Sequence, residues 1–135
     1  MRKDLGFRLS RQAKFWLDAS SGDRFLWVWF VPIGDVVAVV EEAWKRGKKP
    51  SYKVRWWSIE ELEELLSEVY AGAYSFRGYK INRADAVIEN WTDEEKEQFK
   101  KWYEIRRRLM SGEQSEELLK AYNDGIRKGY YLRCI

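Results

Sequence analysis

The sequence predicts an α+β fold, because strand-like patterns fill its first half and helix-like patterns fill its second half. Apolar and polar residues alternate near the N-terminus with the period of two that is typical of half-buried strands. From residue 58 onward, helix-capping signals precede apolar residues at helical spacing. We therefore expect a small antiparallel sheet, made of an N-terminal hairpin plus roughly one to three further strands, packed in two layers against about four helices, with a helix-rich C-terminal half.

The chain is expected to form a single compact domain over residues 1–135. Hydrophobic residues make up 45% of the sequence, which is enough for a chain of this length to bury a core. No repeat, low-complexity tract or flexible linker divides the sequence. Charged residues reach 35%, and Glu and Lys greatly outnumber Asn and Gln, a composition that favours a thermophilic source.

The first predicted element is a hairpin. Apolar and polar residues alternate over 7–17, with Trp16 on the polar side. Turn-forming residues fill 18–23, and residues 24–31 are apolar on both faces, as in a strand at the centre of a sheet. Strand, turn and strand in this order indicate a hairpin.

The segment 35–47 is predicted to form a helix that leads to another strand. Asp35 can cap this helix, its apolar residues fall at helical spacing, and Gly47 can end it. The β-branched run over 36–40 has poor helix propensity, so a strand there is the alternative. Residues 52–56 alternate again and indicate a strand.

Two capping boxes mark helix starts in the second half of the chain. Ser58 and Glu61 open a helix with one continuous apolar face, and Gly72 ends it. Thr92 and Glu95 open a second, longer helix in the same way. These helices are expected to cover the sheet.

Shorter elements are predicted for the rest of this half. Residues 73–81 are typical of a strand or an extended loop, and Asn82 can cap a short helical turn that runs through Ile88. A break over 111–114 precedes the last helix. Residues 130–135 are expected to return as an edge strand.

The composition excludes most enzyme chemistries. Without histidine, neither histidine-based catalysis nor histidine metal ligation is available. The single cysteine, Cys134, can form neither an internal disulfide nor a zinc site by itself. No Gly-rich phosphate loop is present. We expect no cofactor and no metal, and a non-enzymatic protein is favoured over an enzyme.

The sequence carries no signal for export or membrane insertion. No apolar stretch follows the charged residues at the N-terminus, and the longest apolar run, 25–33, is interrupted by Pro32. A cytoplasmic protein without membrane contact is therefore expected.

Eight tryptophans, many of them next to Lys or Arg, give the lead to function. Aromatic rings beside fixed positive charge can stack on unpaired bases while the cations hold phosphates. The predicted polar faces of the strands would carry Arg8, Lys14, Trp16, Lys53, Arg55 and Trp57. The preceding helix end and loop would extend this surface with Lys45, Arg46, Lys48 and Lys49. The leading hypothesis is a single-stranded nucleic-acid-binding protein of a thermophile, or of one of its viruses or plasmids.

The other six tryptophans are expected to pack inside the protein. Four of them lie in a strand that is apolar on both faces or on apolar helix faces, and the strand alternation turns a fifth inward. The set is Trp27, Trp29, Trp44, Trp56, Trp91 and Trp102. Only Trp16 and Trp57 are predicted to share a face with the cations.

Two other classes of function stay open. A small structural or interaction protein would use its aromatic and arginine side chains at an interface with a second copy, as a homodimer, or with another subunit. A Mg²⁺-dependent nuclease would use Asp18, Asp23 and Glu41 or Glu42, with Lys45, to hold the ion and position a water. Turn geometry and helix-stabilising ion pairs explain the same acidic residues without catalysis.

Overall fold

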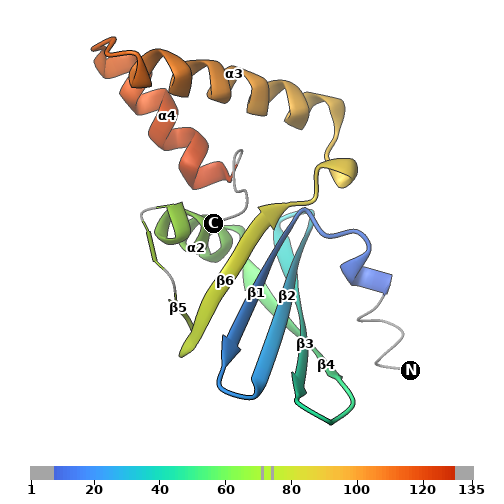
Figure 1. The fold of residues 1–135 in the computed structure, drawn as a ribbon. Helices are drawn as coiled ribbons and strands as arrows, with labels where there is room; N and C mark the ends of the chain where they lie inside the picture. Colours follow the sequence, from blue (N-terminus) through green and yellow to red (C-terminus); the bar gives the residue numbers. More distant parts are fainter. Residues whose placement is uncertain (1–7, 71, 74, 130–135) are drawn as a thin grey trace.

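The protein is built on a six-stranded antiparallel sheet that curves into a half-barrel (Figure 1). The computed structural model describes residues 8–129 except 71 and 74. The strand order is β4-β3-β2-β1-β6-β5. The strands are β1 (Phe15–Ser21), β2 (Arg24–Ile33), β3 (Val36–Lys45), β4 (Ser51–Ser58), β5 (Ser75–Phe76) and β6 (Tyr79–Ala86).

Helices connect and extend the sheet. Residues 8–10 form a short helical stretch before β1, and α2 directly follows β4. A long helix and a shorter one then form a hairpin that extends away from the strands (Figure 1). The elements are α2 (Ile59–Tyr70), the 3₁₀ helix η1 (Ile88–Asn90), α3 (Asp93–Met110) and α4 (Glu116–Lys128). Among the described residues, no helix is both long and apolar enough to span a membrane.

Two-residue turns join the central strands. Gly22 and Asp23 connect β1 to β2, and Gly34 and Asp35 connect β2 to β3. Both glycines have a positive φ, 62° at Gly22 and 65° at Gly34. Two-residue hairpin turns require this left-handed backbone, which side chains with a Cβ disfavour. The Gly-Asp pairs therefore fix the register of the three central strands.

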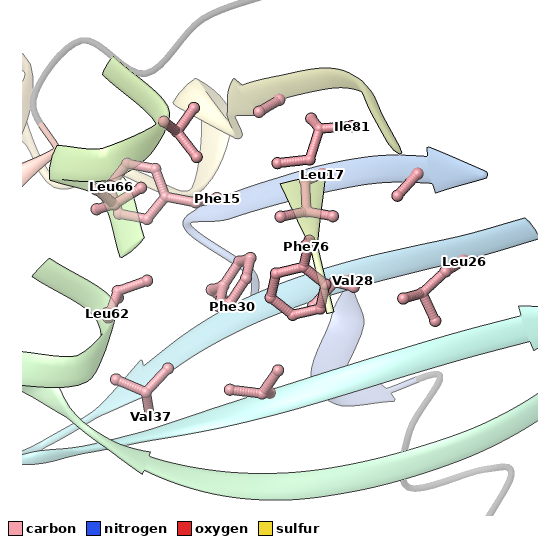
Figure 2. Packing of buried hydrophobic residues seen from close by; sticks show 14 of the residues in the cluster. Phe15, Leu17, Leu26, Val28, Phe30, Val37, Leu62, Leu66, Phe76 and Ile81 are labelled. Carbon is pink, nitrogen blue, oxygen red and sulfur yellow. The ribbon is translucent and has the colours of Figure 1, made fainter. Parts of the chain in front are cut away.

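The sheet has an inner face, which packs against α2, and an outer face, which points away from it. Figure 2 shows the inner core, where Phe15, Leu17, Val28 and Phe30 from the strands meet leucines of α2. Phe76 from β5 joins the same cluster and is 4% exposed. The short β5 thus folds over the inner face, which explains the strong curvature of the sheet.

The outer face is covered only in part by the described residues. Ala13 and Leu9, from the segment before β1, pack against Val31, Ala38 and Val40. This cover lies at the end of the sheet that carries the β2–β3 turn. The rest of the outer face, towards the β1–β2 and β3–β4 turns, carries large aromatic side chains.

The helical hairpin has a small core of its own. The Trp102 ring from α3 stacks on Tyr122 from α4 with centroids 5.3 Å apart, and its Nε1–H donates to the Tyr122 carbonyl at 3.1 Å. Gly125 of α4 lies directly against the Trp102 indole. A Cβ at this position would overlap with the indole ring atoms, so the close packing requires glycine. Trp91 connects this hairpin to the sheet, donating from Nε1–H to the Lys14 carbonyl at 3.1 Å.

The α+β class is confirmed, but the predicted number of strands is wrong. The sheet has six strands, more than the hairpin plus one to three that the sequence suggested. One of the extra strands is β3, where a helix was expected over 35–47. The other arises because residues 73–81, predicted as one strand or an extended loop, hold β5, a turn and the start of β6. Residues 82–86 continue β6 instead of starting a helical turn at Asn82.

The first strand is shorter than predicted, whereas the two capped helix starts and the last helix are present. The first strand begins at Phe15, and residues 8–10, which were expected to belong to it, are helical. Both capping boxes are confirmed: the Ser58 and Thr92 hydroxyls accept from the backbone N–H three residues later, and the glutamates there accept from Ser58 and Thr92 N–H. The last helix is confirmed as α4. The predicted edge strand over 130–135 lies outside the described residues.

Candidate functional site

The two tryptophans that were predicted to share a face lie on opposite sides of the sheet. Trp16 belongs to the outer face, where it pairs across strands with Trp29. Trp57 belongs to the inner face and contacts Phe30 and Phe76, with ring centroids 5.7 and 6.3 Å apart. The single basic-aromatic face predicted from the sequence is therefore not formed.

The cations of β4 point to the inner face together with Trp57. Arg55 donates from Nε to Oε2 of Glu41 at 2.7 Å, and Arg77 from the β5–β6 turn also forms an ion pair with this carboxylate. The Glu41 side chain is only 8% exposed. Lys53, two residues before Arg55 on the same face of β4, is the cross-strand partner of Glu41. Arg55 thus neutralises a buried charge, which explains its presence without any ligand.

The two N-terminal cations are separated from the rest of the predicted site. Arg8 is exposed in the helical stretch before β1. Lys14 lies at the other end of β1 from the β1–β2 turn, where its Nζ forms an ion pair with Glu95 of α3 at 2.5 Å. It lines a cavity of about 410 Å³ between the sheet, α2 and the start of α3. Neither cation lies next to Lys53 or Arg55 in the sheet.

Cross-strand pairing arranges the open part of the outer face in three rows. The row nearest the hairpin turns consists of Lys80, Ser20, Phe25 and Trp44. The middle row consists of Arg83, Asp18, Trp27, Glu42 and Tyr52. The third row consists of Asp85, Trp16, Trp29, Val40 and Val54. It adjoins the covered end of the face, since Val40 is buried and Trp29 and Val54 pack against the same cluster. Tyr52 on β4 and five aromatic side chains from the three neighbouring strands β1, β2 and β3 therefore share this surface.

These rings form a continuous path, which we call the aromatic path: Phe25, Trp44, Trp27, Trp29 and Trp16. Successive ring centroids are 5.4, 5.5, 6.1 and 6.1 Å apart along this order. Trp27 stands nearly perpendicular to both of its neighbours and is 38% exposed. At the far end, the Arg83 guanidinium lies over the Trp16 ring at 5.2 Å, a cation–π contact.

A cluster of cations borders the first row at the lower end of the sheet in Figure 1, where the β1–β2, β3–β4 and β5–β6 connections meet. We call this cluster the basic rim: Arg24, Lys45, Arg46, Lys48, Lys49 and Lys80. Lys45 approaches Asp23 at 3.8 Å, a long contact between two half-exposed side chains. The other five form no ion pair with any residue that the structure describes. All six are exposed. Arg24 and Lys45 alternate with Phe25 and Trp44 and so start from the inner side of the sheet end, whereas Lys80 belongs to the first row itself.

Within the three rows, carboxylates occur only in the two rows away from the rim, and the acid at the rim itself is Asp23 in the β1–β2 turn. Asp18 and Glu42 are the cross-strand partners of Trp27 on its two sides. Tyr52 on β4 is the cross-strand partner of Glu42. Burial raises the pKa of Tyr52, and the interaction of its hydroxyl with the Glu42 carboxylate adds to this effect. The Tyr52 hydroxyl therefore stays protonated at neutral pH and remains a donor.

The residues considered for a magnesium site are dispersed. Glu41 points to the inner face, Glu42 and Asp18 lie on the outer face with Trp27 between them, and Asp23 is in the β1–β2 turn. Among the residues that the structure describes, no three acidic side chains are grouped to hold a metal ion.

The sequence interpretation named only Trp16 among the five rings in the aromatic path, and Phe25 was not assigned to the site. Trp27, Trp29 and Trp44 were expected in the core, and Trp56 was expected to point inward, yet Trp56 is 61% exposed on the outer face. The expected packing of Trp91 and Trp102 is confirmed, with 5% and 4% exposure. The apolar segment 24–31, which forms most of β2, was expected to be covered on both faces. In the structure, the described residues cover only part of its outer face.

Fold and site together define an α+β protein whose curved sheet carries an open aromatic face bordered by exposed cations. No protein-family model matches the chain, and searches of the curated proteins and of the solved structures find no similar protein.

Proposed function

We propose that the chain is a non-enzymatic protein that binds single-stranded nucleic acid on the outer face of its sheet. The aromatic path would stack unpaired bases, and the basic rim would bind the phosphates that connect them. The observation that carries this proposal is the continuity of the two features, since Phe25 and Trp44 lie in the row that the basic rim borders.

The aromatic path favours a single strand over a duplex. Bases in a duplex stack on one another and offer no free ring face, whereas unpaired bases can stack on protein aromatics. Trp27 offers exposed ring surface in the middle of the path. Each stacked base typically contributes about 1–3 kcal/mol.

The distribution of charge favours a defined placement of the strand. Phosphates are attracted to the basic rim, where five cations lack an acidic partner among the described residues. In the two rows away from the rim, the carboxylates of Asp18, Glu42 and Asp85 outnumber the one cation, Arg83, and repel phosphates from the middle of the face. A backbone that follows the rim would direct its bases towards Trp27, which lies one row away.

Binding can be measured by the fluorescence anisotropy of a short labelled oligonucleotide, and stacking by the quenching of tryptophan fluorescence. We expect binding to a single strand that weakens steeply between about 50 and 200 mM salt, and much weaker binding to a duplex of the same length. Absence of binding to every oligonucleotide at low salt would refute the proposal.

Matched variants separate the surface from the overall charge. Lys48→Ala with Lys49→Ala should weaken binding and make the salt dependence shallower, by about 0.7 for each phosphate that the protein no longer binds. Lys100→Ala with Lys101→Ala removes the same charge from α3 and should change binding little. Trp27→Ala should weaken binding about ten-fold or more, whereas Trp56→Ala, more exposed but outside the path, should not.

A second candidate function is self-association through a different part of the outer face. Trp56, Ile33 and Val36 are 61%, 44% and 39% exposed at the end of the sheet opposite the basic rim. An exposed patch of large apolar side chains is typical of protein interfaces. A homodimer that Trp56→Glu converts to monomer, as measured by light scattering, would support this function; a wild-type monomer at high concentration would exclude it.

A further inference from the structure

The ring of Trp27 lies between two carboxylates, an arrangement that exceeds what base stacking alone requires. Asp18 on β1 and Glu42 on β3 are its direct cross-strand partners. Side chains in such pairs have Cβ atoms about 4.5–5.5 Å apart. The edge of a base stacked on this ring would therefore come within reach of the carboxylate oxygens.

The two carboxylates are not equivalent. Glu42 lies directly opposite Tyr52 on β4, and its charge contributes to the raised pKa of that hydroxyl. The Asp18 carboxylate forms no ion pair or hydrogen bond with the described residues, although its cross-strand partner on β6 is Arg83, whose guanidinium lies over Trp16. Asp18 is half-buried, which limits its solvation and strengthens a hydrogen bond to a ligand. Asp18 is therefore the group available to a base, with Glu42 on the opposite side.

A carboxylate discriminates among bases because it only accepts hydrogen bonds. The Watson–Crick edge of guanine presents two neighbouring donors, N1–H and the N2 amino group, which match the two oxygens of one carboxylate. Adenine and cytosine each present one amino group next to an acceptor. Uracil and thymine present a single N–H between two carbonyl oxygens, which a carboxylate repels.

We propose that the Trp27 position selects guanine over uracil or thymine, because Asp18 accepts both donors of the guanine edge. This inference rests on the proposed nucleic-acid function and specifies its base preference. Splayed-out bases in single strands are commonly recognised on this edge. A good bidentate contact of this kind changes affinity by about ten-fold.

The test compares a short oligouridine with the same oligomer carrying one central guanine. A strand with a single guanine cannot fold into a guanine quadruplex. We expect the guanine-containing strand to bind about ten-fold more tightly to the wild-type protein. Replacing that guanine by hypoxanthine, which lacks the N2 amino group, should remove most of the difference. Both strands carry the same phosphates, so the electrostatic contribution cancels.

Two isosteric variants distinguish recognition from charge. Asp18→Asn removes the acceptor pair next to Trp27 and should abolish the guanine preference. Asp85→Asn removes a carboxylate from the same face, opposite Trp16, and should leave the preference unchanged. Both variants reduce phosphate repulsion equally, so both should bind oligouridine at least as well as the wild-type protein.

The outcomes separate this inference from the function on which it rests. If the wild-type protein binds both oligomers equally, the guanine preference is refuted while single-strand binding stands. If Asp18→Asn and Asp85→Asn lower the preference equally, the effect is one of charge and the assignment to Asp18 is wrong. If no oligomer binds at low salt, the proposed function itself fails.

Discussion

Glu41 on β3 and Arg77 in the β5–β6 turn form an ion pair across the inner face of the sheet, although they are far apart in the sequence. Arg55 holds the same carboxylate from the neighbouring strand β4. The contact attaches the β5–β6 hairpin to the opposite half of the sheet. Together with the packing of Phe76 against Trp57, it closes the half-barrel over its core.

Glu41→Gln is expected to destabilise the fold, because it leaves two arginines without their shared carboxylate. Both arginines are about 40% exposed, at 41% for Arg55 and 38% for Arg77, so water can solvate them in part. We therefore expect a loss of about 1–3 kcal/mol in the free energy of unfolding, measured with denaturant. Glu42→Gln on the outer face is the control and should cost less; equal losses would argue against the ion-pair cluster.

Arg77 combines this ion pair with a strained backbone, which allows the two effects to be separated. Its φ of 49° lies in the left-handed region, and it is the only described non-glycine residue with a positive φ. Both Arg77→Ala and Arg77→Gly remove the ion pair, but glycine also relieves the strain, which is about 1 kcal/mol. Arg77→Gly should therefore be the more stable variant in denaturant unfolding; the reverse order would show that the turn is not strained.

The alternation in β4 correctly predicted which side chains share a face, but it could not show which face points to the core. Lys53 and Arg55 were placed outside because cations usually face water. On the inner face, Arg55 shares the carboxylate of Glu41, which was expected to belong to a helix, with Arg77, which follows much later in the chain. Local pattern alone carries no signal for such a cluster.

The strand β3 was predictable from a signal that was present. Gly34-Asp35 separates two β-branched or apolar runs and is typical of a two-residue hairpin turn. The charges of Glu41, Glu42 and Lys45 suggested helical ion pairs instead, but in the sheet they alternate between its faces. With β3 as a strand, Trp44 becomes the cross-strand partner of Phe25 on β2. The outer-face rings of β1, β2 and β3 then lie next to one another and form the aromatic path.

Gly125→Ala tests the packing of the helical hairpin. Alanine favours a helix over glycine by about 1 kcal/mol, but a Cβ at Gly125 would overlap with the Trp102 ring. Because that indole is 4% exposed and stacked on Tyr122, it cannot move freely. We expect a net destabilisation of about 1–3 kcal/mol. Asn123→Ala, at an exposed site of the same helix, should be neutral or stabilising in the same thermal or denaturant unfolding experiment.

The ion pair between Lys14 and Glu95, which joins β1 to the start of α3, should make stability depend on pH. Burial acts to raise the pKa of Glu95, but hydrogen bonds from Lys14 and Thr92, together with the charge of Lys14, outweigh it and leave this pKa below its usual value. Such a carboxylate stabilises the fold above its unfolded-state pKa, about 4.3, and loses this contribution as the pH falls through the folded-state pKa.

Glu95→Gln should therefore be less stable than the wild-type protein near neutral pH, with the difference disappearing towards about pH 3. Because Glu95 is 38% exposed, solvent screening should limit the loss to less than about 1 kcal/mol. Denaturant unfolding at several pH values measures the difference directly. Glu97→Gln, whose partner Lys100 is 72% exposed, is the control and should show a smaller pH dependence. A difference that persists unchanged in acid would mean that Glu95 acts through packing and not through its charge.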